Sequence, residues 1–146
     1  MSTLLVVDDT PANLAMLIDA AGAAGHRVLL AENGERALRL AAKVAPDLIL
    51  LDVNMPGLDG FATCRLLKAD PATREIPVIF ATALSDTRDK VIGLEAGGVD
   101  YVTKPLQPVE VLARIRVHLE LRRLRIELQA EVRQRAANGE CRAERV

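Results

Sequence analysis

Aromatic side chains are almost absent from this sequence of 146 residues: it has no tryptophan, and Phe61, Phe80 and Tyr101 are its only aromatic residues. A folded core must therefore be built mainly from Val, Ile, Leu and Ala. The scarcity excludes the rows of stacked aromatic rings on which many proteins bind single-stranded nucleic acid. The net charge of -1 gives no general attraction for nucleic acid or anionic lipid.

Cysteine and long apolar runs are scarce as well. The two cysteines, Cys64 and Cys141, belong to no Cys-x-x-Cys motif, so the sequence predicts neither a disulfide framework nor a zinc site. No stretch approaches the length of about eighteen apolar residues that indicates a membrane span. The start, MSTLLVVDD, lacks the basic segment of a signal peptide. We therefore expect a cytoplasmic protein with free thiols that is neither exported nor membrane-spanning.

Short apolar runs alternate with longer stretches that have helical periodicity. The predicted strands are Leu4–Val7, Val28–Ala31, Leu48–Leu51, Val78–Ala81 and Val99–Val102, and the predicted helices between them are residues 11–24, 34–45, 58–69 and 86–97. Strands that alternate with helices pair in parallel, and burial on both faces explains why each strand is a continuous apolar run. We predict a doubly wound α/β fold, a parallel sheet in the flavodoxin-like order 2-1-3-4-5 with five helices, the last one extended.

The last predicted helix is long, because residues 109–137 contain neither Gly nor Pro. Its first apolar stripe, which we expect to pack on the sheet, consists of Leu112, Ile115 and Leu119. A second stripe, shifted around the helix, consists of Val117, Leu121, Leu124 and Leu128. The second stripe indicates a short coiled coil or a continuation into another domain, and the alternative is a solvated, Arg-rich helix that frays.

These patterns divide the chain into three parts. We predict a globular domain over residues 1–120 and a helical extension over residues 121–137. Residues 138–146 lose the helical periodicity, and we predict a disordered tail there.

Polar residues follow the predicted strands at the point where each strand ends. They are Asp8 and Asp9 after the first strand, Asp52 after the third, Thr82 after the fourth, and Thr103, Lys104 and Pro105 after the fifth. Ligands of an open parallel sheet bind outside the carboxyl ends of its strands, so these residues mark a candidate site. The first and third strands are neighbours in the predicted order, about 4.8 Å apart, which gathers the three aspartates into one acidic pocket.

Three carboxylates this close repel one another unless a cation is present, so the pocket predicts a divalent metal. Ligands that are all oxygen indicate a hard ion, and a small open site suits Mg²⁺ better than Ca²⁺. Lys104 and Thr82 add an ammonium and a hydroxyl that can hold phosphoryl oxygens. With no Ser, Cys or His at the centre, the nucleophile must be a carboxylate, and Asp52 is the candidate for an aspartyl-phosphate. His26 and His118 have no partners at ligand spacing, and we expect them to be structural or solvated.

Four motifs along the chain resemble those of a known family. They are the acidic pair in LLVVDDTPAN, the segment LILLDVNMPGLDG, the Thr-Ala of IFATA, and DYVTKP. In this order and spacing they resemble the CheY-like receiver domains of two-component response regulators, over about residues 3–120. The resemblance implies that a sensor histidine kinase or a phosphotransfer protein donates a phosphoryl group to Asp52.

The resemblance also implies the metal ligands. Asp9 and Asp52 would bind Mg²⁺ through their carboxylates and Asn54 through its backbone carbonyl, while Asp8 would hold a metal-bound water or assist the ligand shell.

The remaining motif residues correspond to the family's switch. Thr82 and Lys104 match the hydroxyl and the lysine that bind the phosphoryl group, and the Lys104-Pro105 peptide bond matches one that is cis in the family. Tyr101 occupies the position of the switch aromatic, which turns inward when the residue at the position of Thr82 moves towards the phosphoryl group. The surface of the fourth helix, fifth strand and fifth helix would then change.

This resemblance implies a phosphorylation-activated module that signals through a protein-binding or dimerisation surface and catalyses only its own phosphorylation and dephosphorylation. One alternative is a hydrolase of the haloacid dehalogenase type, but that family has its nucleophile and acid two residues apart, whereas Asp8 and Asp9 are adjacent. Another is a scaffold that has lost phosphorylation. No helix-turn-helix follows residue 120, so we expect no direct nucleic acid binding. The expected output is a downstream protein, a fused output domain or a homodimer through the extended helix.

Overall fold

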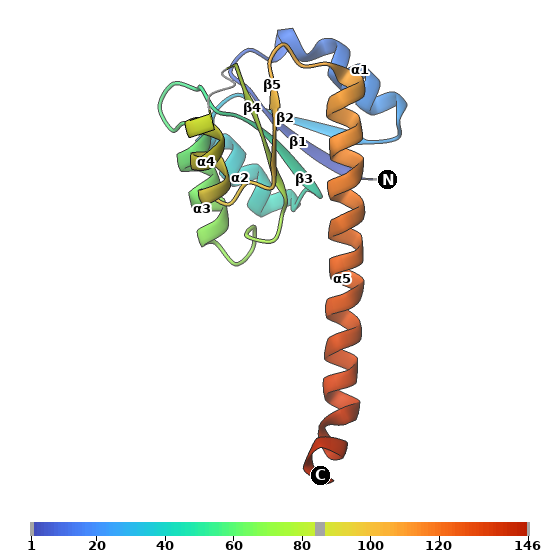
Figure 1. Cartoon of the computed structure of the whole chain (residues 1–146). Coiled ribbons are helices and arrows are strands. Elements are labelled where there is room, and N and C mark those ends of the chain that lie inside the picture. The colour runs from blue at the N-terminus through green and yellow to red at the C-terminus, as the bar shows by residue number, and fades with distance from the viewer. Residues whose placement is uncertain (1, 84–86, 146) are drawn as a thin grey trace.

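The computed structural model describes residues 2–83 and 87–145 as one sheet with helices on both faces (Figure 1). The strands are β1 (Thr3–Val7), β2 (Arg27–Ala31), β3 (Leu48–Asp52), β4 (Val78–Thr82) and β5 (Asp100–Thr103). The helices are η1 (Pro11–Leu14), α1 (Ala15–Ala23), α2 (Gly34–Val44), α3 (Gly60–Ala69), α4 (Thr87–Glu95) and α5 (Pro108–Arg145).

The sheet confirms the predicted topology. Its strands are all parallel and lie in the order β2-β1-β3-β4-β5. Each strand lies within two residues of its predicted bounds. The first predicted helix is instead two elements, because residues Pro11–Leu14 form a 3₁₀ turn before α1 begins. The predicted start of the fourth helix at residue 86 lies outside the described residues.

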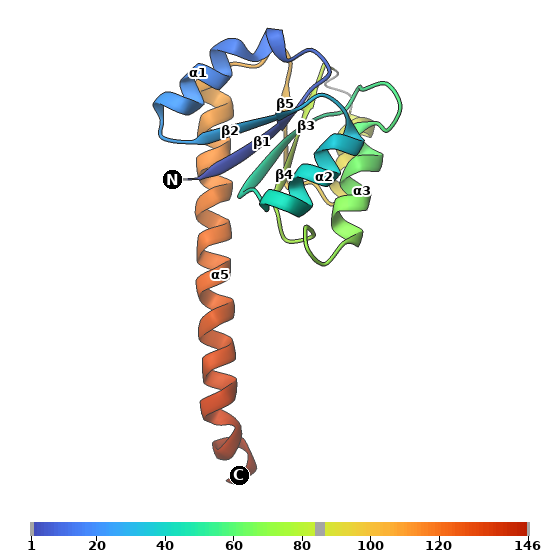
Figure 2. The same cartoon turned by 180° about the vertical axis from the view of Figure 1, so that it is seen from behind.

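Side chains of each strand alternate between two apolar cores, one on each face of the sheet. Figures 1 and 2 show α1 and α5 on one face and α2, α3 and α4 on the other. Leu5, Val7 and Ile49 belong to the core under α2 and α3, whereas Leu4 and Val6 belong to the core under α1 and α5. This two-sided burial is the reason that the strands are uninterrupted apolar runs.

Carboxyl and amide side chains fix the start of two helices. The side chain of Asn33 accepts a hydrogen bond from the backbone N–H of Arg36 at 2.8 Å, which caps α2. Asp59 caps α3 in the same way, through the N–H of Ala62 at 2.8 Å. Such caps satisfy backbone donors that have no partner within the helix. Capping α3 places its first turn against the end of β3.

Helix α5 is much longer than the strands of the sheet. Its 38 residues correspond to about 57 Å at 1.5 Å per residue. Val111 and Ile115 are buried on the sheet, and Leu112 and Leu119 pack beside them, as predicted for the first stripe. The helix runs antiparallel to β5 and passes the amino-terminal edge of the sheet (Figure 1).

The predicted end of this helix at residue 137 is wrong, because the backbone stays helical through Asn138 and Gly139 to Arg145. A single helical Gly costs only about 1 kcal/mol, which neighbouring helical hydrogen bonds can offset, so Gly139 is a weak stop signal. The division of the chain into a domain, an extension and a tail stays a prediction. Among the described residues, no helix combines the length and apolar character that a bilayer span requires.

Gly60 provides a direct test of the packing between α3 and the end of β3. A Cβ atom at this position would lie 2.3 Å from the backbone oxygen of Asp52 and 2.7 Å from the Cα of Val53. We expect Gly60→Ala to lower the free energy of unfolding by about 3 kcal/mol, because backbone must move. The control is Gly22→Ala in α1, where a Cβ meets nothing within 4 Å and helix propensity predicts a gain of about 0.5–1 kcal/mol. Urea unfolding followed by circular dichroism measures both, and equal stability of the two variants would contradict this packing.

Candidate functional site

The register of the sheet brings the predicted aspartates together. Val7 pairs with Leu51, so Asp8 and Asp52 stand at the same level on neighbouring strands. Asp8 and Asp52 are only 3% and 2% exposed, whereas Asp9 is exposed. One carboxylate oxygen from each of the three residues lies within 4.8 Å of the others. The predicted acidic pocket is therefore present at the carboxyl end of β1 and β3.

Lys104 supplies the positive charge of this pocket. Its Nζ lies 3.2 Å from Asp8 Oδ2 and 3.2 Å from Asp52 Oδ1. The backbone of Lys104 is fixed as well, since its N–H donates to the carbonyl of Thr82 at 2.8 Å. The Lys104-Pro105 peptide bond is cis, as the resemblance implied. The Lys104 ammonium bridges two buried carboxylates from different strands.

Thr10 orients Asp8 and was not among the predicted site residues. Its backbone N–H donates to Asp8 Oδ1 at 2.8 Å, and its hydroxyl contacts the same oxygen at 3.0 Å. An Asp followed two residues later by Thr is a common local pattern, in which the carboxylate accepts from the backbone two positions on. This sequence pattern could have predicted the contact between Thr10 and Asp8. With Oδ1 held by Thr10, Oδ2 of Asp8 faces Lys104.

The environment of Asp52 opposes its ionisation on balance. Burial raises the pKa of Asp52, and the charge of Asp8 raises it further, while Lys104 and the N–H of Asn54 at 3.3 Å lower it; the net direction is upward. For Lys104, burial lowers the pKa, but attraction to Asp52 and Asp8 outweighs burial and raises it. The pocket therefore holds a charged lysine beside carboxylates that are short of positive charge.

The two predicted switch residues lie on neighbouring strands. Thr82 is buried at the end of β4, and Tyr101 is half-buried on β5 with the Lys90 ammonium 4.5 Å from its ring centroid. Both line a cavity of about 10 Å³, with Phe80 as a further wall. That is room for about one water molecule and far too little for an aromatic ring. Thr103, also named at the strand ends, is exposed.

A second charged cluster ties β5 to α5 and was missed from the sequence. Both side-chain oxygens of Asp100 lie 3.0 Å from Arg114 Nη1, and Asp100 Oδ2 lies 3.1 Å from His118 Nε2. Burial raises the pKa of Asp100, but hydrogen bonds from Tyr101 N–H, His118 and Arg114 outweigh it and lower the pKa. Arg114 and His118 are one helical turn apart on α5, and this spacing could have predicted that they share a partner. His118 is therefore structural, as expected.

The donor set of the pocket fits a hard divalent cation. Asp8, Asp9 and Asp52 offer only oxygen atoms, and Lys104 balances a single one of the three negative charges. Oxygen-only sites of this kind select Mg²⁺, Ca²⁺ or Mn²⁺.

A five-stranded parallel sheet with three aspartates and a lysine at its carboxyl edge is the arrangement of a two-component receiver domain. The family comparison agrees, since residues 4–116 match the model of the response regulator receiver domain. The chain belongs to this family, whose members are phosphorylated on an aspartate by histidine kinases.

Relatives include the response regulator PleD of Caulobacter vibrioides, 47% identical over 136 residues, which are 93% of this chain and 29% of PleD. The DNA-binding response regulator MtrA of Mycolicibacterium smegmatis is 41% identical over 80% of this chain and 50% of its own length. The chain thus spans half or less of the length of these curated relatives.

Two solved receiver domains have the same fold. The receiver domain of a signal transduction histidine kinase from Syntrophus aciditrophicus superposes with a TM-score of 0.75 and 39% identity, over 82% of this chain and 91% of that one. The receiver domain of the sensor histidine kinase PA1611 from Pseudomonas aeruginosa PAO1 gives a TM-score of 0.75 and 31% identity over 82% and 98%. That structure contains a magnesium ion coordinated in its active-site cleft.

The raised pKa of Asp52 predicts that its charge destabilises the metal-free fold. A carboxyl group with a raised pKa in the folded state supports stability at low pH and loses that support as the pH rises through the folded pKa. At neutral pH and without metal, we expect Asp52→Asn to raise the free energy of unfolding by about 1 kcal/mol. The gain should shrink as the pH is lowered towards the usual carboxyl range. Urea unfolding in EDTA at several pH values measures it, and a less stable variant at neutral pH would refute the expectation.

Proposed function

We propose that Asp52 is the phosphoacceptor of this receiver domain. One observation carries the proposal: the Asp52 carboxylate is buried at the end of the central strand, inside the acidic cluster, with the Lys104 ammonium 3.2 Å away. Carboxylates can act as nucleophiles towards phosphorus. Asp9 is exposed and Asp8 is already held by Thr10, which leaves Asp52 as the carboxylate at the centre of the pocket.

Mg²⁺ is the proposed cofactor. The ligands would be the carboxylates of Asp9 and Asp52 and the backbone carbonyl of Asn54, with Asp8 assisting. When bound, Mg²⁺ neutralises charge that develops on a transferring phosphoryl group. The magnesium ion in the receiver domain of PA1611, which has the same fold, supports this assignment.

The proposed phosphoryl donor is a phosphohistidine on a sensor histidine kinase or a phosphotransfer protein in the cytoplasm. An oxygen of Asp52 bonds to phosphorus as the phosphorus–nitrogen bond of the donor breaks, and the imidazole leaves with the electron pair. The Lys104 ammonium holds one phosphoryl oxygen and the Thr82 hydroxyl donates to another. Hydrolysis of the acyl phosphate resets the domain, so its chemistry is confined to its own phosphorylation and dephosphorylation.

The signal would pass from Thr82 to Tyr101. Drawing Thr82 towards the phosphoryl group enlarges the cavity that both residues line, which at about 10 Å³ has no space for the tyrosine ring. Tyr101 would then turn inward and leave Lys90, which changes the surface formed by α4, β5 and α5. Phosphorylation of Asp52 would in this way change the surface that binds a partner.

The proposed output uses α5 and involves no direct contact with nucleic acid or membrane. The second stripe on α5, Val117, Leu121, Leu124 and Leu128, is exposed on a helix that continues past the sheet. Such a stripe serves a second copy of the chain, a downstream protein or a fused output domain.

Phosphorylation of Asp52 is tested by intact mass after incubation with acetyl phosphate and magnesium. We expect one phosphoryl adduct on the wild type, none on Asp52→Asn and none in EDTA. Asp59→Asn is the matched control, because Asp59 is an exposed carboxylate at the cap of α3, where Asn also caps well, and it should be modified like the wild type. An adduct that survives in Asp52→Asn, or its absence from folded wild type, would refute the assignment.

Metal binding is tested by titrating Mg²⁺ calorimetrically into the unphosphorylated protein. We expect one site, and a loss of affinity of about tenfold or more in Asp9→Asn, because that exposed carboxylate is a proposed ligand. Asp19→Asn on α1 is the control, since it removes the same charge from an exposed position away from the pocket. Unchanged binding in Asp9→Asn would exclude Asp9 as a ligand.

A further inference from the structure

The second stripe of α5 faces away from the body of the protein. Its four side chains are between 47% and 59% exposed. At about 100° per residue, Leu124 lies about 180° around the helix from Ile115, which is buried on the sheet. The spacings of four, three and four residues between Val117, Leu121, Leu124 and Leu128 are those of a coiled-coil seam. The exposed apolar face of α5 is therefore separate from the face that packs on the sheet.

The charges beside the stripe specify a direction of pairing. With Leu121 and Leu128 at heptad position a and Val117 and Leu124 at d, Glu120 and Glu127 fall at g. Arg125 and His118 then fall at e.

In a parallel, in-register pair, a g residue faces the e residue five positions later on the other helix, so Glu120 faces Arg125. In an antiparallel pair, g residues face g residues, which would bring the glutamates together. The charge pattern complements a second copy of this chain in the parallel orientation.

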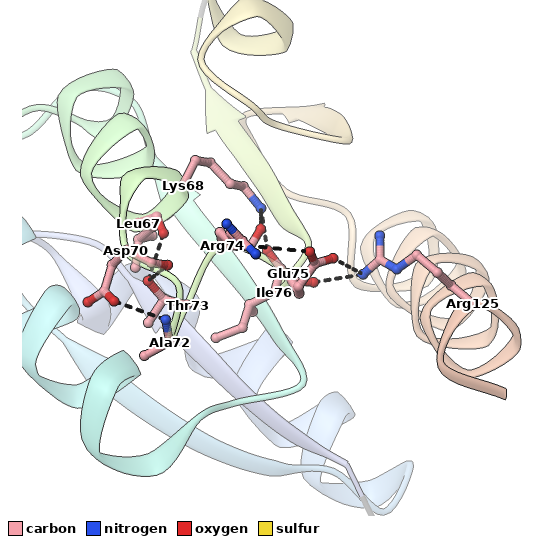
Figure 3. Close-up of polar contacts among 9 residues, drawn as sticks. All are labelled: Leu67, Lys68, Asp70, Ala72, Thr73, Arg74, Glu75, Ile76 and Arg125. Carbon is pink, nitrogen blue, oxygen red and sulfur yellow. Dashed lines mark hydrogen bonds and ion pairs between the residues drawn. The ribbon is translucent and has the colours of Figure 1, made fainter. Parts of the chain in front are cut away.

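In the structure Arg125 has a different partner on its own chain. Its Nη2 donates to the carbonyl of Glu75 at 2.7 Å and lies 3.7 Å from Glu75 Oε2 (Figure 3). Glu75 belongs to the loop between α3 and β4, at the sheet edge that α5 passes. The guanidinium thus joins the extension of α5 to the receiver body.

The loop that receives Arg125 is itself held in place. Lys68 Nζ donates to the carbonyls of Arg74 at 3.0 Å and Ile76 at 2.6 Å, one on each side of Glu75. The hydroxyl of buried Thr73 donates to the carbonyl of Leu67 at 2.7 Å. Arg125 therefore meets a fixed acceptor.

We propose that two copies of this chain pair in parallel and in register through the second stripe, and that Arg125 is shared between Glu75 of its own chain and Glu120 of the second copy. This proposal rests on the self-association included in the proposed function and specifies its geometry. Helix pairing and the contact of the extension with the receiver body then compete for one guanidinium. The contact with Glu75 therefore weakens the pairing of the extension, and release of Arg125 from Glu75 strengthens it.

Charge exchange tests the parallel geometry, with sedimentation velocity over a wide concentration series as the measurement. We expect Glu120→Arg and Arg125→Glu each to raise the dissociation constant of the dimer by about tenfold, since each places like charges at two symmetry-related contacts. The double variant Glu120→Arg/Arg125→Glu should return to within about threefold of the wild type. Arg133→Glu, a charge reversal at heptad position f, is the control and should leave the dissociation constant unchanged.

The outcomes distinguish the parallel geometry from the self-association on which it rests. A wild type that stays monomeric at every concentration overturns this inference and the self-association on which it rests, and leaves a downstream protein or a fused output domain as the partner of the second stripe. A dimer that Glu120→Arg tightens, or that the double variant fails to restore, overturns the parallel geometry alone. Phosphorylation of Asp52 is measured separately and is unaffected by either result.

The sharing of Arg125 has its own test. Glu75→Ala removes the carboxylate that competes for Arg125, and we expect it to lower the dissociation constant of the dimer about two- to threefold. Combined with Arg125→Ala, the Glu75→Ala substitution should have no effect. Because the carbonyl of residue 75 stays in place, an unchanged or weaker Glu75→Ala dimer would show that the Glu75 carboxylate does not compete for Arg125.

Discussion

The bridge from the Lys104 ammonium to Asp8 and Asp52 is the interaction on which the candidate site depends. Two carboxylates that are almost fully buried stand on neighbouring strands, and a buried charge without a partner is strongly destabilising. One ammonium at 3.2 Å from each makes their proximity tolerable. A single ammonium does not neutralise all the carboxylates of the cluster. The protein can therefore fold with this pocket, and the pocket still attracts a cation.

Backbone groups around the pocket position the carboxylates that form this bridge. Thr10 holds one oxygen of Asp8 while the other contacts Lys104, and the N–H of Asn54 holds the oxygen of Asp52 that contacts Lys104. Gly60 lets the first turn of α3 approach the backbone of Asp52 more closely than a side chain would allow. The position of each charge is thus set by main-chain contacts within a few residues of it.

Much of this could be predicted because the physical causes are local or follow from topology. Burial on both faces makes the strands continuous apolar runs, and parallel pairing then brings their carboxyl ends, with Asp8, Asp52 and Lys104, to one edge. The contacts of α5 could not be predicted in the same way. Arg122 with Asp47 and Arg125 with Glu75 join residues 75 and 50 positions apart, and they depend on how the helix is rotated against the sheet. The end of α5 was missed because Asn and Gly are weak signals inside a helix supported by its neighbours.

The length of α5 amplifies small rotations of its packed segment. Residues 120–138 alone form a rod of about 28 Å that extends past the last buried contact, Ile115, and the packed Leu119. If the packed segment pivots by about 10°, the far end of such a rod moves by about 5 Å, which is roughly one helical turn. A rearrangement at the sheet that is too small to alter the core is therefore a large displacement for whatever is attached to the extension.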